Sequence, residues 1–384
     1  MRLSLVSETW APDINGVAHT LGHLGQALVA RGHRLQLIRP RPVTPASAPG
    51  VEEELQLPGI GVPGYRQVRI GLPAGRRLAS LWQAAPPDVI YLATQGPLGW
   101  SAQRIARRLG LPTVAGWHTN FDHYCRDYGV PWLTPLVERR LRTFHNRSTA
   151  TLVPTRALAD HLAARGFADL RVMARGIDAE RFSPAHRDEA LRRRLGAGPH
   201  TPVALYVGRL APEKNLDLLR DAFLTMQAAR PDLRLVIVGD GPCRHALTRR
   251  LPDAHFTGFV PAADLSRYYA SADLFLFPSL SETWGNVVAE AMASGLAVVT
   301  YAHAAGAELI ATGQDGLAVP PGDADAFREA AVALCQEPAR WARLGREARR
   351  RALALSWSSI ADTFIATLEN ARERRHASPD PCRV

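Results

Sequence analysis

The stretch SLSETWGNVVAEAMASG, residues 279–295, places two carboxylates, Glu282 and Glu290, on either side of a Gly285-Asn286 break. Carboxylates near the start of a helix accept hydrogen bonds from sugar hydroxyls, and the first N–H groups of the helix are free to donate to further oxygens. The pattern predicts that Asn286 caps the helix that carries Glu290. Two glutamates at this spacing are also common in solvated helices, so the stretch needs support from other loops.

A pair of cations provides the first support. In GRLAPEKNL, Arg209 follows an apolar run and Lys214 lies five residues further on, with Glu213 near the expected start of the next helix. A guanidinium and an ammonium together can hold a pyrophosphate and offset the charge that develops as it leaves. The alternative interpretation is a charged loop in solvent.

The third loop is APDINGVAHT, in which Asn15-Gly16 precedes a helical pattern. A glycine there allows backbone N–H groups to approach a phosphate, and the helix N-terminus favours negative charge; a simple turn is the alternative. The letters SETW, at residues 281–284, also occur at residues 7–10. Both copies fall where a strand should end, but the residues that follow differ, and the repeat is attributed to chance.

The elements that position these loops alternate between short apolar runs and helical stretches in both halves of the chain. This rhythm predicts an α/β protein with parallel sheets. We expect two Rossmann-like doubly wound domains facing a cleft, over residues 1–176 and 177–356, with a helix at 357–375 that packs back on the first. Ligands of such sheets bind outside the carboxyl ends of the strands. Strands are expected at 2–7, 33–40, 88–94, 112–119, 150–155, 202–210, 233–241, 254–260, 273–279 and 296–301.

Composition narrows the class of protein. The 384 residues carry a net charge of +10, and a basic surface attracts anions such as nucleotides or acidic membranes. Neither a GxGxxG after the first strand nor a Walker A motif is present, which argues against a dehydrogenase or a P-loop enzyme. The four cysteines form no CxxC, so no zinc or redox pair is expected.

No apolar run reaches the ~18–20 residues of a membrane span, and the N-terminus does not resemble a signal peptide.

Longer motifs carry a family resemblance. LYVGRLAPEKNLDLLRDAF, LVIVGDGP, GIDAERFSP and the stretch around Glu282 resemble the retaining glycosyltransferases of family four, which have the GT-B fold, over roughly residues 1–370. SETWAPDINGVAHTLGHLGQALVARGH and HTNFDHYCRDYG are most similar to bacterial GDP-mannose-dependent α-mannosyltransferases.

The resemblance implies roles for individual residues in the second half. Glu282 would meet the hydroxyls of the transferred sugar, and Glu290 would hold the ribose hydroxyls. Arg209 and Lys214 would hold the diphosphate. Backbone groups from Trp284 to Val287, including Gly285 and Asn286, would contact sugar and phosphate, with Trp284 where Phe is commoner.

In the first half, His118 would lie near the C6 hydroxyl of the donor sugar, and Gly16 would lie beside the diphosphate. Two departures from the family pattern stand out. Asn15-Gly16 replaces a common Gly-Gly, and Arg175 begins a segment that usually reads Asn-Gly-Val-Asp.

The implied reaction needs no bound metal or cofactor, because the cation pair stabilises the departing nucleoside diphosphate. Its substrates are a nucleotide-sugar donor, GDP-mannose or another, and a lipid or glycan acceptor. The basic, partly apolar stretch 130–148 predicts contact with an anionic membrane surface, so the protein is expected in the cytoplasm or on the inner face of the plasma membrane. A helix packed on its own domain is the alternative for 130–148. Nucleic acid is not expected as a partner.

Two other functions remain open. One is a UDP-sugar-dependent glycolipid or polysaccharide glycosyltransferase. The other is a non-catalytic sugar-nucleotide-binding protein, against which the presence of Glu282, Glu290, Arg209 and Lys214 argues.

Overall fold

The computed structural model describes residues 1–377 except 14, 44, 46, 63–64, 119–131 and 133. The chain divides into two compact units, Met1–Gly176 together with Trp357–Val384, and Ile177–Ser356. Most of the segment HTNFDHYCRDYG, and residues 130, 131 and 133 of the basic stretch, lie outside the described residues.

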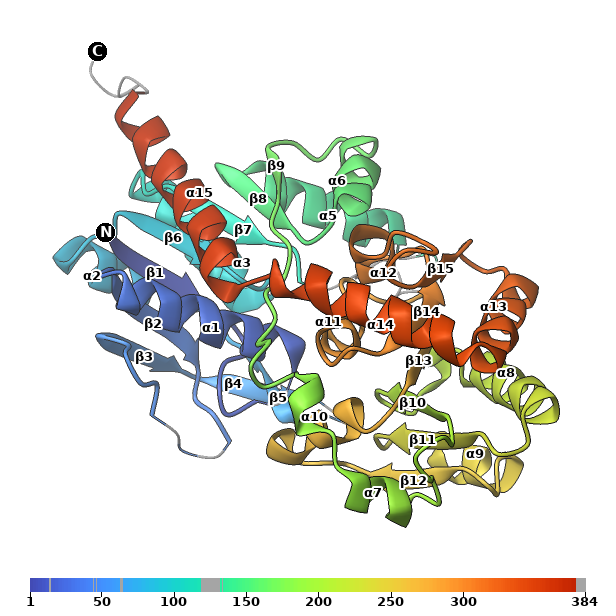
Figure 1. The fold of residues 1–384 in the computed structure, drawn as a ribbon. Helices are drawn as coiled ribbons and strands as arrows, with labels where there is room; N and C mark the ends of the chain where they lie inside the picture. Colours follow the sequence, from blue (N-terminus) through green and yellow to red (C-terminus); the bar gives the residue numbers. More distant parts are fainter. Residues whose placement is uncertain are drawn as a thin grey trace. The chain divides into compact units, whose positions relative to one another are not determined.

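The first unit is built on a seven-stranded parallel sheet (Figure 1). The spatial order is β3-β2-β1-β6-β7-β8-β9. Its strands are β1 (Arg2–Val6), β2 (Arg34–Pro40), β3 (Glu53–Leu57), β6 (Val89–Leu92), β7 (Thr113–Gly116), β8 (Ala150–Val153) and β9 (Leu170–Val172). A separate antiparallel hairpin joins β4 (Gly59–Val62) to β5 (Tyr65–Gly71).

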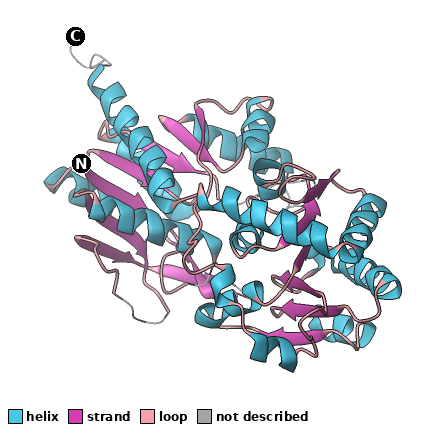
Figure 2. Cartoon of the chain, in the orientation of Figure 1, coloured by secondary structure: helices cyan, strands magenta, loops and turns pink. Residues whose placement is uncertain are grey.

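Helices cover both faces of this sheet (Figure 2). They are α1 (Gly16–Ala30), α2 (Gly75–Ala84), α3 (Pro97–Arg108), α5 (Thr134–Asn146), α6 (Arg156–Ala163) and α15 (Trp357–Ala377). Alternate residues of β1 and β6 enter two apolar clusters, as expected for strands buried on both sides. One cluster joins the apolar face of α1 to Ile360, Phe364 and Leu368 of α15, so the last helix completes the core of the first unit.

The second unit has a six-stranded parallel sheet in the order β12-β11-β10-β13-β14-β15. Its strands are β10 (Val203–Val207), β11 (Arg234–Val238), β12 (His255–Gly258), β13 (Leu274–Phe277), β14 (Ala297–Tyr301) and β15 (Leu317–Val319). Its helices are η2 (Pro184–His186), α7 (Glu189–Arg194), η3 (Pro212–Lys214), α8 (Leu216–Ala229), α9 (Arg244–Arg250), α10 (Ala262–Ala270), α11 (Asn286–Ala293), α12 (Ala305–Leu309), α13 (Ala324–Gln336) and α14 (Pro338–Leu353).

The strand order of each sheet reverses at one position. In the first unit, β1 lies between β2 and β6; in the second, β10 lies between β11 and β13. The loops that leave the two strands flanking such a reversal point diverge, and the crevice between them is where doubly wound sheets bind ligands. All ten predicted strands are present, and the strands that begin these loops are among them.

Candidate active site

The reversal point of the second unit brings Lys214 and Glu282 together. The Nζ of Lys214, in the loop after β10, donates to Oε1 of Glu282, in the loop after β13. The hydroxyl of Ser279 donates to the same carboxylate oxygen at 3.0 Å. Both charged side chains are largely shielded from solvent, so this is a charge-assisted contact and not a loose surface pair.

The second predicted cation is also paired. Arg209 donates through Nη2 to the carboxylate of Glu213, four residues further along the chain. The hydroxyl of Ser281 donates to the carbonyl of Glu213 at 3.1 Å, which ties this loop to the loop that carries Glu282. Each cation therefore already has a carboxylate contact.

The turn into α11 differs from the prediction. Gly285, not Asn286, is the N-cap residue, and no side chain caps this helix. Gly285 has φ of +91°, a left-handed conformation that glycine adopts without the steric cost of a Cβ. Asn286 is the first helical residue. The N–H groups at this helix end are consequently not occupied by a capping side chain, which is the arrangement that anion binding at a helix start requires.

Trp284 anchors the same turn. Its side chain is buried, and its carbonyl accepts a hydrogen bond from the N–H of Ala305 at 2.7 Å. Among the described residues, its indole Nε1 has no hydrogen-bond partner. The neighbouring Val287 is half-buried on the first turn of α11. The tryptophan thus fixes the backbone of the turn and leaves backbone groups for a ligand.

Glu290 lies one turn into α11 and accepts a hydrogen bond from the hydroxyl of Tyr269 at 2.8 Å. Burial raises the pKa of Glu290, and the contact with Tyr269 and the charge of Arg181 offset part of this rise. The pKa of Tyr269 is raised by burial and by the same carboxylate. Tyr269 comes from α10, and nothing in the sequence near Glu290 pointed to it.

In the first unit, His118 is buried at the end of β7, between two polar side chains. Arg175 Nη2 donates to Nδ1 at 2.7 Å, and Nε2 lies 2.9 Å from the hydroxyl of Tyr91. Burial and the Arg175 cation hold the pKa of His118 well below its usual value. A neutral ring whose Nδ1 accepts must carry its proton on Nε2, so the ring donates to Tyr91.

Arg175 is itself unusual. It is buried, its Nη1 has no hydrogen-bond partner among the described residues, and burial lowers the pKa of its guanidinium to about 10. The sequence marked this position only as a departure from the family pattern. The structure shows that the departing residue contacts the predicted site histidine.

Gly16 opens α1, as predicted, and is exposed. However, the side chain of Asn15 caps the helix, and its Oδ1 accepts from the N–H groups of Val17 at 3.1 Å and Ala18 at 2.9 Å. These donors are therefore already used, and the predicted phosphate contact at this helix is restricted to what Gly16 itself can offer.

Two protein families and several known proteins are similar to this chain. The family described as Glycosyltransferase Family 4 matches residues 14–181, and the family Glycosyl transferases group 1 matches residues 201–337. The GDP-mannose-dependent alpha-mannosyltransferase of Mycobacterium tuberculosis is 35% identical over 385 residues, covering 98% of each chain. The chain belongs to the family-four glycosyltransferases.

A second relative of this glycosyltransferase is the GDP-mannose-dependent alpha-(1-6)-phosphatidylinositol dimannoside mannosyltransferase of Mycobacterium tuberculosis, 30% identical with 96% of each chain covered. Among solved structures, sucrose-phosphate synthase from Thermosynechococcus elongatus is similar in fold, with a TM-score of 0.76, 21% identity, and coverage of 98% of this chain and all of that one. The fold is GT-B, as the sequence predicted.

Proposed function

We propose that this glycosyltransferase is a retaining α-mannosyltransferase that takes mannose from GDP-mannose and transfers it to a lipid or glycolipid acceptor. The supporting observation is the similarity over almost the whole chain to the two mannosyltransferases above, whose names specify GDP-mannose as donor. The name of the second specifies a phosphatidylinositol glycolipid as acceptor.

The donor side is assigned to the second unit. Arg209 and Lys214 bind the diphosphate, exchanging their carboxylate partners Glu213 and Glu282 for phosphate oxygens. Release of Glu282 from Lys214 frees its carboxylate for the hydroxyls of mannose. The N–H groups at the start of α11, at Gly285, contribute further donors.

Glu290 is assigned to the ribose. A carboxylate can accept from both ribose hydroxyls, and the hydrogen bond from Tyr269 orients it. Burial raises the pKa of Glu290, so its carboxylate is protonated at a higher pH than an ordinary glutamate. As the solution is acidified, GDP affinity is therefore expected to begin falling at a higher pH.

In the reaction, the bond between the anomeric carbon and the phosphate oxygen breaks, and positive charge builds on the mannose ring. The acceptor hydroxyl attacks on the face that the diphosphate leaves, and its proton passes to the leaving phosphate oxygen. Retention of the α configuration follows. Arg209 and Lys214 stabilise the charge that develops on GDP, the part a metal ion plays elsewhere. The described residues contain no cluster of three or more metal-ligating side chains.

We assign the membrane-facing surface to the start of α5. Trp132 is 74% exposed and Leu136 is 55% exposed, beside the exposed Arg139 and Arg140. The later part of the helix packs into the core through Phe144. In the described part of the chain, no helix is long and apolar enough to span a bilayer. The surface therefore suits peripheral attachment to anionic lipid.

Vesicle sedimentation tests this attachment. The double variant Trp132→Ser, Leu136→Ser should bind anionic vesicles at least ~10-fold more weakly than wild type, since burying such side chains is worth about 1.5–3 kcal/mol each. Arg142→Gln is the control, because Arg142 Nη1 is held by the carbonyl of Arg165 at 2.9 Å. If the wild-type protein does not bind anionic vesicles at low salt, the proposed attachment is ruled out.

The donor is tested by thermal shift with GDP-mannose, UDP-glucose and ADP-glucose, followed by turnover on phosphatidylinositol micelles with and without EDTA. GDP-mannose should stabilise the protein most, and turnover should survive the chelator and give an α-linked product. Larger stabilisation by a UDP-sugar, or loss of turnover in EDTA that Mg²⁺ restores, contradicts the proposal.

A further inference from the structure

Arg175 is a buried cation that has no role in the function described so far. Within the described residues its guanidinium makes one hydrogen bond, from Nη2 to Nδ1 of His118 at 2.7 Å, and Nη1 has no partner. Burial lowers the pKa of Arg175 to about 10, and no described carboxylate offsets this. Arginine is almost never fully buried without a paired charge, because an unpaired buried cation is costly. Packing alone therefore does not explain an arginine at this position.

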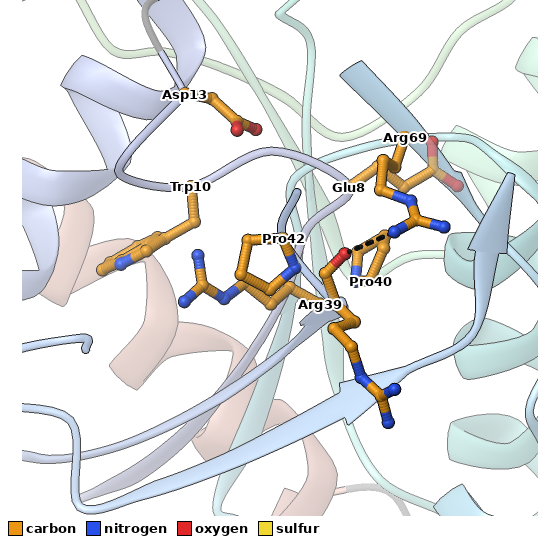
Figure 3. A pocket seen from close by; sticks show the side chains of 8 residues that line it. Glu8, Trp10, Asp13, Arg39, Pro40, Pro42 and Arg69 are labelled. Carbon is orange, nitrogen blue, oxygen red and sulfur yellow. Dashed lines mark hydrogen bonds between the residues drawn. The ribbon is translucent and has the colours of Figure 1, made fainter. Parts of the chain in front are cut away.

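Two other arginines of the first unit, which line a small pocket, show the usual surroundings of a guanidinium (Figure 3). Arg39, near the end of β2, donates from Nε to the carboxylate of Glu54 at 2.6 Å. Arg69, in the hairpin strand β5, donates to two backbone carbonyls, at 3.3 Å and 2.5 Å. Both side chains therefore donate to oxygen atoms, whereas the acceptor of Arg175 is a nitrogen of an imidazole ring.

Two glycines make room for the contacts of this ring. A Cβ at Gly116, in β7, would overlap the hydroxyl of Tyr91 and would lie 2.5 Å from Nε2 of His118. A Cβ at Gly176 would lie 2.5 Å from an aromatic ring at the start of α15, so the backbone beside Arg175 is packed closely there. The cluster of Tyr91, His118 and Arg175 is therefore built into three separate segments of the chain.

The contact with Arg175 restricts the protonation of His118. A guanidinium only donates hydrogen bonds, so the nitrogen that faces it must keep a lone pair. Protonation of Nδ1 would set two donors against each other across 2.7 Å. The contact therefore disfavours the imidazolium and leaves the proton of the neutral ring on Nε2, 2.9 Å from the hydroxyl of Tyr91. Burial, the charge of Arg175 and the neighbouring His145 all lower the pKa of His118, which agrees with this restriction.

We propose that Arg175 is a positioning residue, which acts on the reaction only through His118 by holding this ring neutral with its proton on Nε2. The inference rests on the proposed function in placing His118 beside the transferred mannose. Positive charge builds on that sugar as its bond to phosphate breaks. An imidazolium beside it would add a second positive charge to that of Arg175 and raise the barrier, whereas the neutral ring does not.

A purely structural role for Arg175, in which it ties the segment after β9 to the end of β7, makes a different prediction. Loss of a structural contact would slow the reaction whatever residue stands at position 118. A residue that acts only through His118 has no effect once the imidazole has been removed. The effects of the two substitutions are then not additive, and a double-mutant cycle separates the two roles.

NMR of the full-length protein with ¹⁵N-labelled histidine reads the state of the ring without donor or acceptor. The signals of His118 are those that the His118→Asn variant lacks. In the wild type they should show a neutral ring with its proton on Nε2 from pH 8 down to pH 5.5. Arg175→Asn offers an amide that can donate or accept, so both neutral tautomers should be populated and the ring should take up a proton at a higher pH than in the wild type.

Rates of mannosyl transfer test the effect on the reaction. Between pH 7.5 and pH 5.5, kcat of Arg175→Asn should fall more than that of the wild type, by up to about tenfold if the pKa of His118 returns to its ordinary value. The titratable and charged groups around this ring are Tyr91, His145 and Arg175. Arg171→Asn, at an exposed position in β9, is the control and should keep the wild-type profile.

The double-mutant cycle is measured at pH 7.5. The variant that carries both Arg175→Asn and His118→Asn should have the same kcat as His118→Asn alone. GDP affinity should be unchanged in every variant, because His118 is assigned to the sugar and not to the nucleotide.

Three results would each overturn the inference. The first is a wild-type His118 that carries its proton on Nδ1 or titrates at its ordinary pKa, which decides the matter even if Arg175→Asn does not fold. The others are a double variant slower than His118→Asn, and coinciding pH profiles of Arg175→Asn and Arg171→Asn. Absence of turnover with GDP-mannose contradicts the proposed function instead. The NMR result then still stands, and the rates are measured with the sugar nucleotide that the thermal shift selects.

Discussion

The same four residues, Ser-Glu-Thr-Trp, leave a strand at the reversal point of each sheet, and their glutamates lie in opposite electrostatic surroundings. Glu282 in the second unit is paired with Lys214. Glu8 in the first unit has one carboxylate oxygen without a partner among the described residues, and burial brings its pKa near 7. Both tryptophans are buried, so the tetrapeptide anchors both loops alike.

The difference comes from the loop across the crevice. Opposite Glu282, the loop after β10 supplies an ammonium group. Opposite Glu8, the loop after β6 supplies the hydroxyl of Thr94, which accepts from the Glu8 backbone N–H at 3.0 Å, and the start of α3. The cation of an ion pair can release its carboxylate partner and bind a ligand anion instead. A carboxyl group whose pKa lies near neutral pH can gain or lose its charge. The same local sequence therefore suits two kinds of chemistry.

The largest effect is expected at the ion pair. Lys214→Ala should lower kcat/KM for GDP-mannose about 10²–10³-fold, the size of losing one donor that stabilises developing charge. Glu282→Gln should lower kcat while leaving GDP affinity equal or higher, because Lys214 is then free for phosphate. Steady-state rates and GDP calorimetry measure both. If Glu8→Gln reduces GDP affinity as much as Lys214→Ala does, the two glutamates are not separated in function.

The pH dependence of stability comes next. The pKa of Glu8 is higher in the folded state, about 7, than its ordinary 4.5, so the folded protein binds more protons between these values. The stability that this proton binding contributes is fully present below pH 4.5 and is lost as pH rises through 7. The free energy of unfolding then falls by about 3 kcal/mol. Urea unfolding at pH 5 and pH 8 should therefore show a smaller loss of stability in Glu8→Gln than in wild type. Identical losses would mean that Glu8 titrates normally.

Glu290 and Tyr269 are expected to act on ground-state binding. Glu290→Gln should weaken GDP by about 1.5–3 kcal/mol, the worth of a hydrogen bond to a charged group. Tyr269→Phe should weaken it less, because the carboxylate remains but loses one orienting bond. Calorimetry with GDP decides, and GMP serves as the matched ligand that keeps the ribose. If the Glu290→Gln variant bound both GDP and GMP with normal affinity, Glu290 would not be part of the ribose site.

The smallest effect concerns the backbone at the second loop. Gly285→Ala should destabilise by roughly 1–2 kcal/mol, because Gly285 has a left-handed φ of +91°. Gly22→Ala in α1 is the control; apart from the backbone of its own helix, no atom lies within 4 Å of its new Cβ, and alanine should stabilise this helix by about 0.5–1 kcal/mol. Equal Tm changes in the two variants would indicate that the turn before α11 relaxes freely.

The sequence predicted the main strands and the site loops because apolar runs and Gly-containing turns are local signals. It missed β3, with its acidic EELQL, and the three-residue β9 and β15, where pairing to a neighbouring strand decides the structure. It placed the cap of α11 on Asn286, although the left-handed turn puts Gly285 there.

Contacts between distant segments could not be predicted from the sequence, because they depend on which strands become neighbours and not on a local pattern. Lys214 and Glu282 were found separately, but their pairing depends on β10 and β13 being neighbours. Tyr91 in β6 and Arg175, which follows β9, both form hydrogen bonds with His118. No local sequence pattern connects these three residues. Glu8 was noticed only as part of the repeated SETW letters, because its altered pKa arises from burial in the folded protein.

The return of α15 to the first unit has a consequence for synthesis. The apolar face of α1, with Leu21, Leu24 and Leu28, is completed by residues of α15, which the ribosome adds after the whole second unit. Residues 177–356 are continuous, so the second unit can close its core while the first still lacks a layer. The nascent N-terminal half therefore exposes a leucine face until α15 has been made, and exposed apolar surface of this kind is what chaperones bind.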